Sequence, residues 1–276
     1  MVKYSFLFKS LAFLFSLFIL SIFFFENTKS LKEFIEPFEP LGSGTTQQAI
    51  GNSFILLLIT LLASIFLITF IKINKKFFIE LLIIYLPLFS VFFILQLFFQ
   101  IIFDNSIIGI IFSFVLIIVA YLSYIKRNKF LFTISLIFIS SSISTYFTIV
   151  LSIDVLLFLI IVFVIYDIVA VFKGPLKVLI KEMKVKRKIV RKESLFAFGF
   201  LFSNVLGIGI GTGDFIFYSL ILLFIYQLKG IFSSIISFIF LYAGFLLTLY
   251  LLEKYKRPLP GLPLPLTLAL LSMLLT

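Results

Sequence analysis

Histidine and cysteine are both absent from this chain of 276 residues. Without histidine, Ser–His and Cys–His catalysis are excluded, as are zinc sites that need an imidazole ligand. Without cysteine, disulfides, thiolate nucleophiles and iron–sulfur clusters are excluded as well. An enzyme with this sequence must therefore rely on aspartate, glutamate, serine, threonine, tyrosine or lysine.

Charge is scarce too, because Asp, Glu, Lys and Arg make up only 13% of the residues. Apolar residues make up 62%, against about half in a soluble domain, and phenylalanine alone supplies 41 residues. This composition excludes a soluble two-domain enzyme and predicts a polytopic membrane protein. We expect it to lie in the lipid bilayer, which is the plasma membrane if the source is prokaryotic.

Nine apolar stretches are candidates for membrane helices, since a hydrocarbon core of about 30 Å needs about 20 apolar helical residues. The predicted spans are Leu7–Phe25, Ile50–Ile71, Phe77–Phe103, Ile107–Ile125, Phe130–Leu151, Val155–Phe172, Val205–Leu228, Ile231–Leu252 and Leu262–Thr276. No small-residue cleavage site follows the first stretch, so we interpret it as a retained helix. The predicted fold is an all-α membrane protein that forms one polytopic domain over residues 1–276.

Lysine and arginine are distributed very unevenly between the two sides that nine alternating spans define. Of the 23 basic residues, 20 lie on the side of the N-terminus, and only Lys29, Lys32 and Lys229 lie on the other. The positive-inside rule then predicts a cytoplasmic N-terminus and an external C-terminus. The net charge of +11 is explained by topology, so we expect no nucleic-acid partner. The basic loop 174–193 is predicted to be cytoplasmic, where anionic lipid headgroups could bind it.

Two aspartates, Asp167 and Asp214, lie well inside apolar runs, where a charge costs at least about 2.5–3.5 kcal/mol. Asp154 marks the outer start of the sixth span, and Asp167 lies 13 residues after it. Gln227 marks the outer end of the seventh span, and Asp214 lies 13 residues before it. Both carboxyls are therefore about 20 Å below the outer face. A lone aspartate could be a neutral residue bonded to a neighbouring helix, but two at one depth on consecutive antiparallel spans favour a dyad.

A carboxyl dyad is suited to peptide hydrolysis without a metal or another cofactor. Two close carboxylates cannot both ionise easily, so they share a proton. The ionised member can deprotonate a water molecule, while the protonated member donates to the scissile carbonyl. A proton-coupled transporter could also use paired aspartates inside the membrane, and that alternative stays open.

Three short motifs surround the aspartates. Tyr166 directly precedes Asp167, and a run with glycine at alternate positions, 207–213, directly precedes Asp214. Each glycine costs roughly 1 kcal/mol in a helix relative to alanine, so the run indicates either close helix packing or backbone near a ligand. Four prolines in 258–265 preclude a regular helix over these residues and indicate a helix start or non-helical backbone beside a cavity.

Together these motifs resemble those of the presenilin and signal peptide peptidase family of intramembrane aspartyl proteases. The family's Tyr-Asp, Gly-x-Gly-Asp and Pro-Ala-Leu motifs are similar to Tyr166-Asp167, Gly211-Thr212-Gly213-Asp214 and Pro260-Gly261-Leu262, in the sixth, seventh and ninth spans. The resemblance covers all nine spans. It implies that Asp167 and Asp214 are catalytic, and that the substrate is a transmembrane peptide. The residues implied to shape its binding site are Tyr166, Gly211, Thr212, Gly213, Pro260, Gly261 and Leu262.

The chain departs from the family pattern in three places, one of which is Thr212, where the family often has a larger apolar residue. Gly261 replaces the family's alanine and is still small enough for close approach to the aspartates. The loop between the sixth and seventh spans is short, as in compact microbial relatives, so we expect an uncut chain without an obligate partner subunit; a homo-oligomer is possible. Residues 1–154 would form a scaffold and residues 155–276 the catalytic part. A prepilin-type aspartyl peptidase shares a similar Gly-x-Gly-Asp string, but the other two motifs argue against it.

The apolar stretch Leu195–Leu228 is too long for one span, because its 34 residues would form a helix of about 51 Å. We therefore expect part of it to be non-helical, with Leu195–Ser203 extended. An extended segment has free backbone groups to which a substrate strand can add. The family resemblance implies a similar hybrid sheet of enzyme and substrate.

Overall fold

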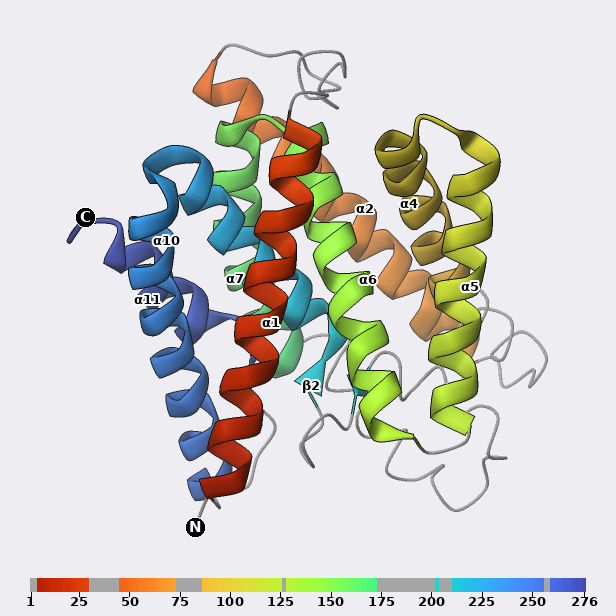
Figure 1. Cartoon of the computed structure of the whole chain (residues 1–276). Coiled ribbons are helices and arrows are strands. Elements are labelled where there is room, and N and C mark those ends of the chain that lie inside the picture. Colours follow the sequence, from red (N-terminus) through yellow and green to blue (C-terminus); the bar gives the residue numbers. More distant parts are fainter. Residues whose placement is uncertain are drawn as a thin grey trace.

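The computed structural model describes residues 4–29, 45–72, 86–125, 128–172, 202–203, 210–255 and 259–276. Its helices are α1 (Tyr4–Thr28), α2 (Thr46–Lys72), α4 (Leu86–Phe103), α5 (Ser106–Ile125), α6 (Lys129–Val150), α7 (Ile153–Phe172), α10 (Thr212–Tyr255) and α11 (Pro263–Ser272). The two-residue strands β1 (Phe202–Ser203) and β2 (Ile210–Gly211) pair antiparallel. The predicted all-α class is confirmed (Figure 1).

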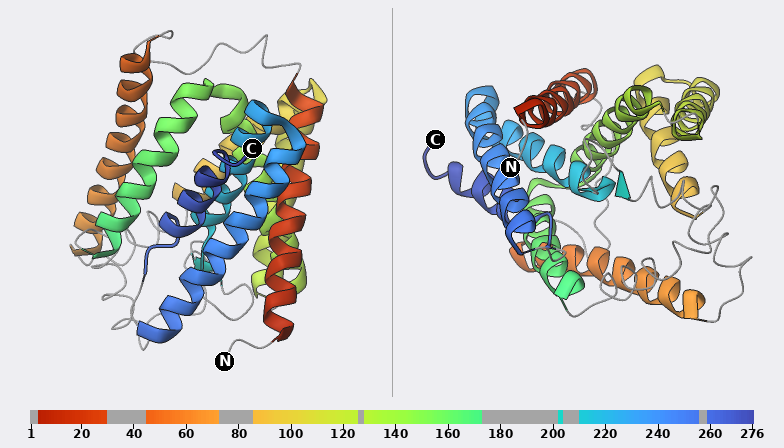
Figure 2. Two further views of the ribbon diagram at one scale, coloured as in Figure 1. Left: turned by 90° about the vertical axis from the view of Figure 1, so that its left-hand side faces the viewer. Right: turned by 90° about the horizontal axis from the view of Figure 1, so that it is seen from below.

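Helix α10 consists of two antiparallel legs that meet at Gly230, where φ is 80° (Figures 1 and 2). Glycine adopts this left-handed conformation readily because it has no β-carbon. The legs correspond to the seventh and eighth predicted spans, so every one of the nine predicted stretches overlaps a helix in the described residues. Five of these helices are long and apolar enough to cross a membrane. The protein is thus an integral membrane protein, while the number of crossings and the orientation of the termini remain predictions.

The helix boundaries beside the three motifs test the sequence prediction most closely. The seventh helix begins at Thr212 rather than Val205, because Ile210–Gly211 is extended and paired with β1. The last helix, α11, has only 10 residues and ends at Ser272 rather than Thr276. It begins at Pro263, one residue after the predicted start at Leu262, which confirms the interpretation of the prolines as a helix start. The expectation that no regular helix covers 258–265 is wrong for residues 263–265. Proline is tolerated in the first helical turn because the N–H groups of that turn have no hydrogen-bond acceptor within the helix, so nothing is lost when proline lacks one.

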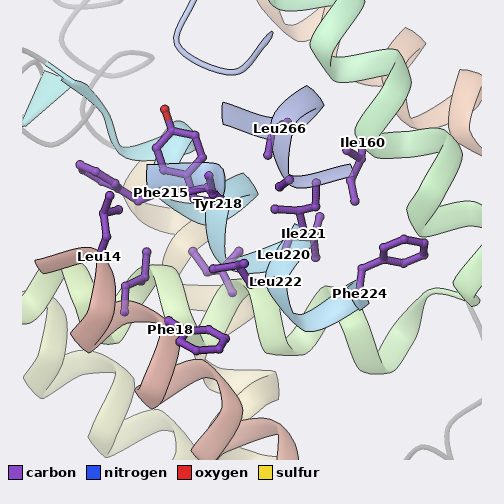
Figure 3. Packing of buried hydrophobic residues seen from close by; sticks show 14 of the residues in the cluster. Leu14, Phe18, Ile160, Phe215, Tyr218, Leu220, Ile221, Leu222, Phe224 and Leu266 are labelled. Atoms are coloured by element: carbon purple, nitrogen blue, oxygen red, sulfur yellow. The ribbon is translucent and has the colours of Figure 1, made fainter. Parts of the chain in front are cut away.

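The first leg of α10 lies at the centre of the packing. Helix α10 as a whole contacts α1, α6, α7 and α11, while α2 packs against α7, and α4 and α5 pack against α6. Figure 2, seen from below, shows these as two arms that meet at α10. In Figure 3, Ile221 of α10 packs with Ile160 of α7 and Leu266 of α11, all of them buried. Helix α10 therefore contacts both α7, which carries the Tyr-Asp motif, and α11, which the proline motif precedes.

A seam of buried hydroxyls fixes the first leg of α10 against α1 and α6. The Ser219 hydroxyl contacts the Ser144 hydroxyl at 2.6 Å and is also hydrogen-bonded to Ser21. All three side chains are almost completely buried. Small polar residues let membrane helices approach closely and form hydrogen bonds between them. Ser219 lies five residues after Asp214, so the seam holds the helix that presents this aspartate.

Helix α11 is attached along the second leg of α10. The hydroxyls of Ser237 and Ser272 lie 2.6 Å apart, and the Lys229 ammonium donates to the carbonyl of Met273 at 2.6 Å. At the other end, Gly244 is so close to α11 that an added β-carbon would lie 2.7 Å from the Leu264 carbonyl oxygen. These contacts place the residues just before α11 beside the two aspartates.

Candidate active site

Asp167 lies in the last two turns of α7 and is only 9% exposed. Its Oδ2 atom accepts a hydrogen bond of 3.0 Å from the backbone N–H of Leu262, and the backbone amide of Gly261 also faces this carboxyl. The donors come from the non-helical turn before α11, where backbone N–H groups have no helical partner. The Pro-Gly-Leu motif thus binds Asp167 through its backbone.

Asp214 lies in the first turn of α10, directly after strand β2, and its side chain is half-buried. Its carboxyl packs on the α-carbon of Gly261. A β-carbon added there would stand 2.9 Å from Asp214 Cγ and 3.3 Å from Oδ1, and would collide with Oδ2. The same backbone turn that binds Asp167 therefore also contacts Asp214.

The two carboxyls converge on the consecutive residues Gly261 and Leu262. The path from Asp167 Oδ2 through the Leu262 nitrogen and the Gly261 α-carbon to the Asp214 carboxyl limits their separation to at most about 10 Å. Helices α7, α10 and α11 also contact one another pairwise. Two predicted aspartates and two residues of the proline motif, far apart in the sequence, thus form one cluster.

Tyr218 is a component of this cluster to which the sequence analysis gave no role. Its hydroxyl donates a 2.8 Å hydrogen bond to the Gly261 carbonyl, and the residue is only 1% exposed. The ring meets Phe215 and Phe245 edge-on (Figure 3 shows Tyr218 beside Phe215). Tyr218 follows Asp214 by four residues, and this helical spacing places both on one face of α10. That spacing is the sequence signal that could have identified it.

The other predicted site residues adjoin the aspartates in the sequence or the proline motif, and their surroundings differ from one to the next. Tyr166 is half-buried, and its ring lies 6.0 Å from that of Phe163. Gly211 pairs with Phe202 in the short sheet, and Thr212 begins α10. A β-carbon at Gly213 would meet nothing within 4 Å, so this glycine is not required for close packing. Pro260 is half-buried and directly precedes Gly261.

No group of three or more acidic side chains that could hold a metal ion occurs among the residues the structure describes. The polar groups that meet in the cluster are two carboxyls, a phenol and the amides of one turn. The two carboxyls can exchange protons with a water molecule and a peptide, while the amides and the phenol can donate hydrogen bonds.

The fold and this cluster define a helical membrane protein with two aspartates gathered at one backbone turn. Two solved structures of a presenilin family intramembrane aspartate protease, in space groups C222 and P2, are similar to it. The first has a TM-score of 0.63 at 17% identity, covering 98% of this chain and 97% of that one. The second has a TM-score of 0.60 at 16% identity, covering 96% and 94%. The presenilin-like fold expected from the motifs is therefore confirmed.

At the level of sequence, no protein-family model and no curated protein matches the chain. The similarity is thus one of fold over nearly the whole length, and what the site does must be argued from its own residues.

Proposed function

We propose that this protein is an intramembrane aspartyl endopeptidase that hydrolyses peptide bonds in single-span transmembrane helices. The observation that carries the proposal is the convergence of Asp167 and Asp214 on the Gly261–Leu262 backbone in a presenilin-like fold. A structural role alone would be served by one neutral aspartate bonded to a neighbouring helix. Two carboxyls gathered at one turn match the requirement of acid–base hydrolysis.

In the proposed mechanism, Asp167 and Asp214 share one proton and hold a water molecule between them. The ionised carboxyl removes a proton from the water, which attacks the scissile carbonyl carbon. The protonated carboxyl donates to the carbonyl oxygen, and a tetrahedral diol forms. The carboxyl that took a proton from the water then donates it to the leaving nitrogen, while the other carboxyl, now ionised, takes a proton from a diol hydroxyl. The C–N bond breaks, a carboxylic acid and an amine leave, and both carboxyls are back in their starting states.

Substrate binding is proposed to involve strand addition near the start of α10. Phe202–Ser203 form the extended strand β1, which pairs with Ile210–Gly211. Strand β2 ends three residues before Asp214. This extended backbone supports the expectation for residues 202–203, and residues 195–201 lie outside the described ones. A peptide bond inside a helix is shielded, so a substrate that adds as a strand would present its bond unfolded to the aspartates.

The test is cleavage of a single-span helical peptide by the purified protein in detergent and in liposomes. We expect two products whose masses add up to the peptide plus one water, without added metal or cofactor. Mass spectrometry identifies the cut bond, which we expect inside the apolar segment. Proton-coupled solute flux in liposomes without any cleavage would contradict the proposal and favour the transporter alternative.

A further inference from the structure

We infer that Tyr218 is a positioning residue for the proposed dyad, acting through the single peptide group that joins Gly261 to Leu262. The inference rests on the proposed protease function. It adds one residue to the proposed site and explains how α7 and α10, which carry the two aspartates, are fixed relative to each other.

The Gly261–Leu262 peptide group is hydrogen-bonded at both of its polar ends. Its carbonyl oxygen accepts from the Tyr218 hydroxyl at 2.8 Å, and its N–H donates to Asp167 Oδ2 at 3.0 Å. Tyr218 belongs to α10, which also carries Asp214, whereas Asp167 belongs to α7. One planar peptide thus bridges the helices of both aspartates.

This bridge fixes the orientation of the turn. A peptide group is planar, so anchoring its carbonyl also sets the direction of its N–H. Hydrogen bonds in series polarise one another, so the Tyr218 bond strengthens the donor that Asp167 receives. The α-carbon of Gly261, which adjoins this peptide, lies against the Asp214 carboxyl. Rotation of the turn would therefore displace the contacts of both aspartates.

The tyrosine itself has little freedom to move. It is among the largest fully buried side chains, and its ring contacts Phe215 on the same leg and Phe245 on the other leg of α10. A rigid ring that ends in one directed hydroxyl is suited to hold a turn whose N–H groups have no helical partner. Phenylalanine at this position would keep the ring packing and remove only the hydroxyl.

The chain offers a matched control in Tyr242, on the second leg of α10. Its hydroxyl also donates to a backbone carbonyl, that of Leu7 in α1, at 2.9 Å. Tyr242→Phe therefore removes the same type of bond from the same helix away from the aspartates. The Leu7 carbonyl keeps a second donor, the Ser10 hydroxyl at 2.9 Å, so Tyr242→Phe should lower the melting temperature no more than Tyr218→Phe does.

The experiment compares kcat and KM of wild type, Tyr218→Phe and Tyr242→Phe on one helical peptide, with the melting temperature of each. We expect Tyr218→Phe to lower kcat roughly 10- to 100-fold, as small misplacements of catalytic groups do, with KM within about twofold. Tyr242→Phe should keep the wild-type kcat. An unchanged kcat for Tyr218→Phe, equal losses in both variants, or a loss confined to KM would overturn the inference while leaving the protease function intact. A wild-type protein without cleavage would overturn the protease function first, and this inference with it.

Discussion

The α-carbon of Gly261 lies against the carboxyl of Asp214, so closely that an added β-carbon would be 2.9 Å from Asp214 Cγ. Alanine, the residue expected here from the family resemblance, does not fit unless the carboxyl moves. The expectation that Gly261 is small enough for close approach to the aspartates is confirmed for Asp214. The position of Asp214 is thus coupled to the absence of a side chain at Gly261.

We predict that Gly261→Ala lowers kcat about tenfold, because the Asp214 carboxyl has to rotate away from the new methyl group. A carboxyl at the end of a side chain can move, so the loss should be partial. Gly261→Val, which is larger, should remove activity almost entirely. Peptide cleavage assays on folded protein measure both variants, and an alanine variant as active as wild type would show that Asp214 is not held by this contact.

A second prediction concerns the contact between the second leg of α10 and the start of α11. Gly244→Ala would place a β-carbon 2.7 Å from the Leu264 oxygen and the Pro265 α-carbon, which are backbone atoms that cannot rotate away. Overpacking of this kind costs about 1–3 kcal/mol, more than the roughly 1 kcal/mol that alanine contributes to a helix. We expect a lower melting temperature together with a lower kcat, because α11 carries the turn that contacts both aspartates.

Gly109→Ala is the matched control for Gly244→Ala. A β-carbon at Gly109 would lie 2.8 Å from the backbone nitrogen of Gln100, within the α4–α5 hairpin. This variant should lose stability to a similar degree but keep the wild-type kcat in its folded fraction. If both variants lost kcat equally, the effect would report general destabilisation rather than displacement of α11.

A third prediction tests strand addition at β1. Phe202→Pro should strongly reduce cleavage because proline removes a backbone donor from the extended segment that pairs with β2. Phe202→Leu keeps that donor and should cost far less. The same pair of substitutions at Phe200, outside the described residues, is expected to behave alike. Equal effects of proline and leucine, or none from either, would argue that no substrate strand adds here.

The orientation in the membrane is predicted from the distribution of lysine and arginine alone. Because the chain has no cysteine, a single cysteine introduced at Glu182 or Glu36 is a clean probe. A membrane-impermeant thiol reagent should label the Glu182→Cys variant only from the cytoplasmic side and the Glu36→Cys variant only from outside. The reverse pattern would mean the opposite orientation.

The length and composition of the apolar runs predicted the helices well, because each long apolar run must become a helix if it is to satisfy its backbone inside lipid. Counting residues along the spans predicted matching depths for Asp167 and Asp214, and the structure brings both carboxyls to one turn. The start of the seventh helix was less accurate, at Thr212 rather than Val205, because local backbone geometry beside the glycine run rather than hydrophobicity decides where this helix begins.

The finer arrangement of the site was not accessible from the sequence. The hydrogen bond from Tyr218 to Gly261 joins residues 43 positions apart, and that from Leu262 to Asp167 joins residues 95 apart. Such bonds depend on how three helices pack, and no local pattern encodes the packing. Gly244 illustrates the same limit, since only its contact with α11 distinguishes it from an ordinary helical glycine.

The central claim is that Asp167 and Asp214 act as one catalytic unit, and the most direct measurement is cleavage by Asp167→Asn, Asp214→Asn and the double variant. Each substitution keeps the size of the side chain and removes the ionisable carboxyl. We predict that each single variant stays folded and loses cleavage completely, and that the double variant is no worse than either, because members of one unit are not additive. A single variant that cleaves the helical peptide at a near-normal rate while remaining folded would contradict the account.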